Sequence, residues 1–118
     1  MANQQKGEVG LKAGDVTYRF RLTTNVLCEM EDHFGKTFNE VMAELGEKPS
    51  MKGMREIVRF ALSENDPAPD AKKAGEIIDE AGSIAVTEAL KKAIKLAFPD
   101  AKEGDENPPV TAGTGKTS

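Results

Sequence analysis

Residues 8–23 carry the pattern that most constrains the fold of this chain, because two alternating segments flank a two-residue turn. The second segment, Val-Thr-Tyr-Arg-Phe-Arg-Leu-Thr at 16–23, alternates apolar and polar side chains, which is typical of a half-buried strand. Gly14-Asp15 between the segments favours a tight hairpin turn. The resulting register puts every apolar side chain on one buried face and pairs Ala13 with Val16, Leu11 with Tyr18 and Val9 with Phe20.

A lone hairpin is marginally stable in water, so something must cover its apolar face, and amphipathic helices are the expected cover. The first helix is predicted over residues 25–34, with Thr24 or Asn25 as its N-cap. Gly35 suits the left-handed position at which such a helix stops. The strand at 16–23 therefore runs into a helix with almost no loop between them.

The rest of the folded region is predicted to be helical, and its boundaries follow from capping residues and breakers. A capping box from Thr37 to Glu40 opens the second helix, which Gly46 ends. Ser50 caps the third helix, over 51–64, and Asp70 caps the fourth, which runs to Ala81. The fifth helix spans about 83–98. The predicted fold class is α+β, an N-terminal β-hairpin followed by four or five α-helices. We expect a single domain over 1–98 and a disordered tail over 99–118, which is rich in proline, glycine and charge.

Composition excludes several classes of function. The chain has 118 residues and a formal net charge of −4, so it lacks the basic excess of a nucleic-acid binder. Its single cysteine rules out an internal disulfide. The N-terminal residues have no apolar core of a signal peptide, and no apolar run is long enough to cross a bilayer. We expect a cytoplasmic protein that contacts neither nucleic acid nor membrane.

No set of side chains in the sequence converges on a catalytic, metal or cofactor site. Cys28 and His33 are the only soft ligands, and on one helix they point in different directions. One cysteine and one histidine fall short of a structural zinc site, and Cys28 lacks a second histidine to act as its base. We therefore predict a protein that is not an enzyme and that needs no cofactor.

Two features are candidates for a partner surface. Glu29, Glu31 and Asp32 form the densest acidic cluster of the folded region, for which a solvated helix face is the simpler interpretation and a partner-binding patch the alternative. The fifth helix has an unusually wide apolar arc that includes Leu96, which it could use to contact both the hairpin and the third helix, or to bind a partner. Phe60 lies off the stripe of its own helix and is a further candidate for an exposed apolar contact.

Several segments of the chain match the sequence of a known family. The most recognisable is Arg21-Leu-Thr-Thr-Asn-Val-Leu-Cys-Glu-Met-Glu31, and the match begins with Asn3-Gln-Gln-Lys-Gly-Glu-Val9. Further segments are Arg55-Glu-Ile-Val-Arg-Phe-Ala-Leu62, Ala74-Gly-Glu-Ile-Ile-Asp-Glu-Ala-Gly82, and the final helix ending Ala97-Phe-Pro99. On these segments the chain resembles, over about residues 3–99, a small phage-derived family found in gene transfer agents, the phage-like particles of alphaproteobacteria, and in related prophages.

The resemblance implies a role in tail morphogenesis, either as a tail assembly chaperone or as a tail tube component. Two short strands and about five helices look too helical for a tube, so we favour a tail assembly chaperone that binds tape-measure or tube subunits. The alternative is a structural component of the tail of a prophage or gene transfer agent, which would place the chain inside an assembled particle. The resemblance also allows for a homo-oligomer. Together with the surface candidates, it suggests a partner-binding set of Leu22, Thr24, Asn25, Glu29, Glu31, Phe60 and Leu96.

Overall fold

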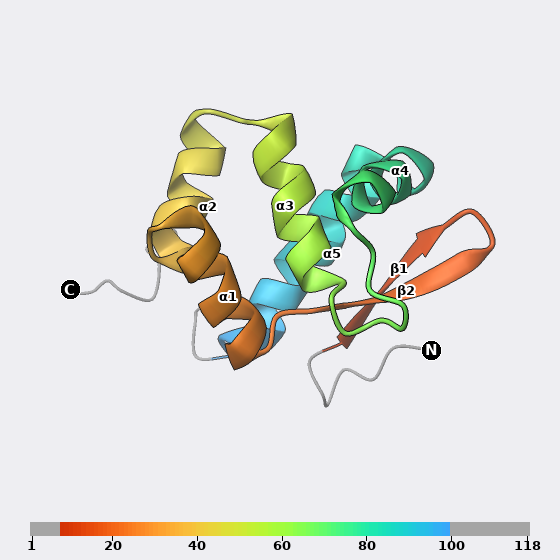
Figure 1. Cartoon of the computed structure of the whole chain (residues 1–118), viewed down its shortest axis with the longest axis horizontal. Helices are drawn as coiled ribbons and strands as arrows, with labels where there is room; N and C mark the ends of the chain where they lie inside the picture. The colour runs from red at the N-terminus through yellow and green to blue at the C-terminus, as the bar shows by residue number, and fades with distance from the viewer. Residues whose placement is uncertain (1–7, 100–118) are drawn as a thin grey trace.

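The computed structural model describes residues 8–99 and has the predicted α+β class, with an antiparallel hairpin followed by five helices (Figure 1). Apart from Pro99, the tail predicted to be disordered lies outside the described residues. Within the described residues, no helix is both long and apolar enough to cross a bilayer.

Strand β1 (Glu8–Ala13) pairs with β2 (Val16–Arg21) in the predicted register. Gly14 takes a positive φ of 64° in the turn, a conformation that glycine adopts without steric cost. The prediction that all apolar side chains are buried is wrong at the tip, where Val16 is 49% exposed. Near the turn α4 contacts β1, so Ala13 is covered while Val16 beside it on β2 is not.

The first helix, α1 (Thr24–Phe34), starts one residue earlier than predicted. Its N-cap is Thr23, whose hydroxyl accepts a hydrogen bond from the Val26 N–H at 3.1 Å, rather than Thr24 or Asn25. Gly35 has a φ of 70° and ends the helix in the left-handed conformation, as predicted.

The next three N-caps are confirmed. Thr37 opens α2 (Phe38–Glu47) with a complete capping box, Ser50 caps α3 (Met51–Ala61), and Asp70 caps α4 (Ala71–Ala81). Two predicted ends are wrong, because α2 runs through Gly46 to Glu47 and α3 stops at Ala61 instead of 64. Helix α5 (Ser83–Ala97) follows Gly82 directly.

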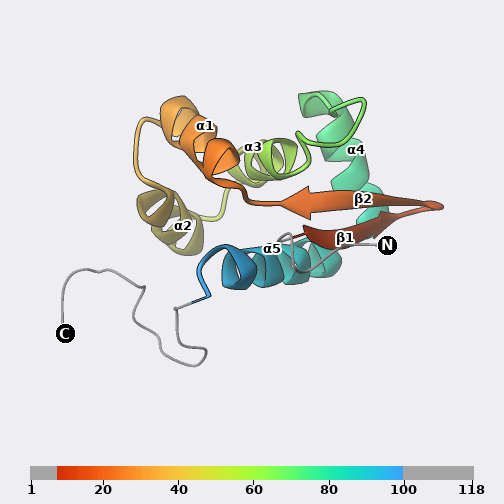
Figure 2. The ribbon, with the colours of Figure 1, turned by 90° about the horizontal axis from the view of Figure 1, so that it is seen from below.

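The core lies between the hairpin and helices α3, α4 and α5, which contact its strands (Figures 1 and 2). Its largest fully buried side chains are Phe20, Leu11, Met30, Ile57, Leu62 and Ile77. Burying one side chain of this size contributes about 1.5–3 kcal/mol, so this shared core holds the hairpin to the helices. Helix α5 packs on the hairpin, as expected, and also on α4.

Helices α1 and α2 form a pair at one end of the molecule, beside α3 (Figure 1). The ring of Phe38 at the start of α2 stacks on Phe98, just after α5, with 5.9 Å between ring centroids. Helix α2 is thereby attached to the C-terminal end of α5, while one side of it faces α1 and α3.

Candidate functional site

The seven residues predicted to bind a partner do not form one surface. Leu22 is only 5% exposed and Phe60 only 8%, so the expectation that Phe60 offers an exposed apolar contact is wrong. Thr24 and Asn25 are exposed on the first turn of α1. Leu96 on α5 is half-buried against the core.

The acidic face of α1 is exposed, and one of its members has a structural partner. Glu29, Glu31 and Asp32 are all exposed. The carboxylate of Glu31 accepts a hydrogen bond from the Phe38 N–H at 2.9 Å, at the first residue of α2. A carboxylate at a helix N-terminus satisfies a free N–H and complements the helix dipole. Glu31 therefore helps to set the position of α2 relative to α1.

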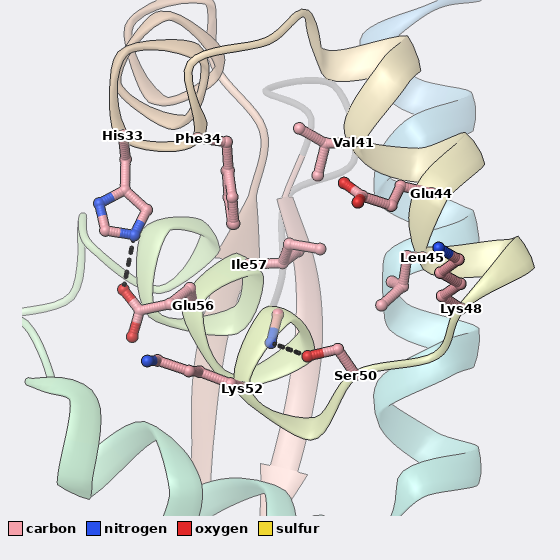
Figure 3. A pocket seen from close by; sticks show the side chains of 11 residues that line it. His33, Phe34, Val41, Glu44, Leu45, Lys48, Ser50, Lys52, Glu56 and Ile57 are labelled. Atoms are coloured by element: carbon pink, nitrogen blue, oxygen red, sulfur yellow. Dashed lines mark hydrogen bonds and ion pairs between the residues drawn. The ribbon is translucent and has the colours of Figure 1, made fainter.

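Beside this junction, α1, α2 and α3 enclose an open groove of about 400 Å³, which we call the three-helix groove (Figure 3). Its apolar residues come from all three helices and are Phe34, Val41, Leu45 and Ile57. Its polar residues are His33, Glu44, Lys48, Ser50, Lys52 and Glu56. The groove thus combines an apolar lining with charges of both signs.

Capping interactions hold the walls of the groove in place. The Thr37 hydroxyl accepts from the Glu40 N–H at 3.1 Å, and the Glu40 carboxylate accepts from the Thr37 N–H at 2.9 Å, which fixes the start of α2. The Ser50 hydroxyl accepts from the Gly53 N–H at 3.0 Å and fixes the start of α3 (Figure 3). Each such cap contributes about 1 kcal/mol, and together they set the directions of two walls.

Glu56 on α3 organises the polar wall between α1 and α3. Its side chain is 11% exposed, and its Oε1 accepts from Arg59 Nε at 2.9 Å and Nη2 at 2.7 Å. The same oxygen lies 3.4 Å from His33 Nε2 on α1, and Oε2 lies 3.8 Å from Arg55 Nε. A carboxylate this buried needs such partners, because burying an unpaired charge is costly.

Aromatic packing explains why Phe60 is buried. The His33 ring lies 5.0 Å from the Phe34 ring in an edge-on arrangement and 5.3 Å from the Phe60 ring. The Arg59 guanidinium sits over the Phe60 ring at 4.4 Å from its centroid. Through these contacts Phe60 joins α1 to α3.

On the opposite wall, Glu44 is paired with Lys36 at the start of the α1–α2 connection. The hydrogen bond from Lys36, together with its positive charge, holds the pKa of the Glu44 carboxyl below its ordinary value. Glu44 and Lys36 thus form an ion pair on this wall of the groove.

A groove of this kind suits the apolar face of a partner helix or another apolar side-chain cluster. Its volume is within the range of about 300–1,000 Å³ found for binding pockets. Helices dock in such grooves through apolar anchors at helical spacing, while charged rims select their orientation. Within residues 8–99, no group of three or more histidine, cysteine, aspartate or glutamate side chains could hold a metal ion. The single cysteine, Cys28, is exposed on α1 and does not line the groove.

The sequence predicted the helices that form the groove but not the groove itself. Val41 and Ile57 are core residues and Leu45 packs against the core, so nothing in the sequence marks them as groove residues. Glu56 was not singled out, although it is the one carboxylate of a helix that carries Arg55 and Arg59 beside it, which was a usable signal. Comparison with protein-family models, with curated proteins and with solved structures gave no match to this chain.

Proposed function

We propose that this protein binds an apolar helical segment of another phage-tail protein in the three-helix groove, and so acts as a tail assembly chaperone. The observation that carries the proposal is the groove, where the half-buried side chains of Phe34 and Leu45 lie beside the buried Val41 and Ile57 within a polar border. The class of partner, a tape-measure or tube subunit, rests on the resemblance of the sequence to the gene-transfer-agent and prophage family. We place this activity in the cytoplasm, where tails are assembled.

The shape of the groove supports a helical partner. The half-buried side chains of Phe34 and Leu45 face a common space from α1 and α2, beside the fully buried Ile57 of α3 (Figure 3). A partner helix could insert side chains from successive turns into that space, as amphipathic helices do in other grooves. Glu44 and Lys48 on the α2 side, with Lys52 and Glu56 on α3, would orient a partner whose helix carries both charges (Figure 3).

The fold supports a chaperone role over a tube role. The described strands β1 and β2 have six residues each, whereas a tube ring is built from long strands. The role we propose is binding without catalysis. In keeping with it, His33 is engaged in packing between Phe34 and Phe60 and in its contact with Glu56.

Co-purification with the tail proteins of the same particle tests the proposal. We expect the tape-measure or tube protein to be captured by the wild-type chain and lost with Leu45→Lys, which puts a charge into the groove. The matched control is Ile84→Lys, because Ile84 is 81% exposed on α5 and outside the groove. Electron microscopy and mass analysis of finished particles complete the test. Presence of the chain in finished tails would favour the structural alternative and contradict the chaperone role.

A further inference from the structure

The two carboxylates that line the three-helix groove are already neutralised within the fold. Glu56 accepts hydrogen bonds from Arg59 at 2.9 and 2.7 Å and lies 3.4 Å from His33 Nε2. On the opposite wall, Glu44 is ion-paired with Lys36. A cation on a bound partner would have to compete with these contacts, so neither carboxylate offers it much gain.

The two lysines that line the groove are exposed and lack such partners. Lys48 directly follows α2, and Lys52 lies in the first turn of α3. In the part of the chain that the structure describes, neither ammonium group forms an ion pair or a hydrogen bond. The hydrogen bond and charge of Lys36 are the main cause of the lowered pKa of Glu44, and the charge of Lys48 adds a smaller part through space. The positive charges of the groove are therefore the ones left for a partner to neutralise.

The lysines are placed on both sides of the apolar lining. Figure 3 shows Lys48 at the end of α2 and Lys52 on α3, with Leu45 and Ile57 between them. A helix that lays its apolar stripe over Leu45 would bring each flank of that stripe near one lysine. Carboxylates on the flanks would meet opposite charges there, whereas lysines or arginines would meet like charges, which is unfavourable.

We propose that the partner of the three-helix groove is an amphipathic helix whose apolar stripe is flanked on both sides by glutamate or aspartate. This inference rests on the proposed function, because it requires a helix in the groove, and it defines which charges that helix presents to Lys48 and Lys52. The charge of the whole chain acts in the opposite direction, since a formal net charge of −4 attracts basic peptides at long range. A preference for an acidic helix would thus have a local origin in the groove.

Three synthetic peptides test the inference on the wild-type full chain. Each has about 18 residues, or about five helical turns. All share one leucine stripe and differ only in the residues that flank it, which are glutamate, glutamine or lysine. In an NMR titration of the isotope-labelled chain, we expect the glutamate peptide to shift the amide signals of Leu45, Lys48 and Lys52 and to bind about tenfold more tightly than the lysine peptide. At about 1 M salt, where the Debye length is only about 3 Å, this difference should disappear.

Charge reversal in the groove provides the second arm. Lys48→Glu combined with Lys52→Glu should reverse the preference, so that the lysine peptide binds more tightly than the glutamate peptide. Both side chains are exposed, and the comparison of peptides on the wild-type chain does not depend on this variant. The matched control is Lys91→Glu, the same change at an exposed residue of α5, which lies across the hairpin from α1 and α3 (Figure 2). It should leave the preference as in the wild type.

The outcomes separate this inference from the proposed function. Groove amides that shift equally with the glutamate and lysine peptides, or a preference for glutamate that survives the double substitution, would overturn the acidic partner while helix binding in the groove stands. If none of the three peptides shifts these amides, helix binding in the groove is contradicted, and the inference is overturned with it.

Discussion

Replacing Asn65 with alanine should loosen the hairpin from the helices, because this one side chain bridges them. The change removes three hydrogen bonds, two to the Arg19 backbone and one to the Leu62 carbonyl. Each has a net value of about 0.5–1.5 kcal/mol, but the groups at Arg19 are exposed and can bond to water instead. We therefore expect the free energy of unfolding to fall by about 1–2 kcal/mol.

In a domain of about 90 residues, each kcal/mol lowers the melting temperature by about 4–8 °C, which circular dichroism resolves easily. Hydrogen exchange adds a local readout, since the Arg19 amide should lose its protection in the variant while the Phe20 amide, which pairs within the hairpin, keeps most of it. Asn39→Ala on the exposed face of α2 is the matched control and should leave both measurements unchanged. An unaltered melting temperature together with an Arg19 amide that stays protected would refute the bridging role of Asn65.

Three further predictions concern the core, a cap and an ion pair. Phe20→Ala, at a fully buried position, should lower the free energy of unfolding in urea by about 3–5 kcal/mol, and a loss below about 1 kcal/mol would show that Phe20 is not central to the core. Thr37→Ala should cost about 1 kcal/mol in the same assay, with faster amide exchange at Glu40, and unchanged exchange there would argue against the capping box. Lys36→Ala should raise the pKa of Glu44 toward its ordinary value, measured by NMR titration of the carboxyl. A Glu44 pKa that the substitution leaves unchanged would exclude the pair with Lys36 as the cause of the lowered pKa. Because the pKa of Glu44 is lowered in the folded state, the pair stabilises the fold above the ordinary pKa of 4.5. This stabilisation is lost as the pH falls through the folded pKa.

Local features of the chain were predictable because short segments determine them. The hairpin register follows from the Gly14-Asp15 turn and the alternation around it, and the caps at Thr37, Ser50 and Asp70 follow from the chemistry of single side chains. The first cap was misplaced by one residue because Thr23 stands beside two other residues that cap equally well.

The site was not predictable from local patterns, because it depends on contacts between helices that are distant in the sequence. Phe60 lies off the stripe of α3, and it is buried where α1 packs on α3, with His33 of α1 and the Arg59 guanidinium on its ring. Val16 is the opposite case, since it fits the strand alternation but lies where no helix covers β2. In both cases the placement of a helix relative to another element decides the burial of the side chain.

Binding of a partner segment in the three-helix groove is the central claim, and an NMR titration of the isotope-labelled full chain tests it most directly. Peptides spanning the tape-measure protein of the same particle would be added in turn. We expect one amphipathic peptide to shift the amide signals of Phe34, Leu45 and Ile57, and we expect Leu45→Lys, but not Ile84→Lys, to abolish these shifts. Shifts that survive Leu45→Lys, or no shift with any tape-measure or tube peptide, would contradict the account.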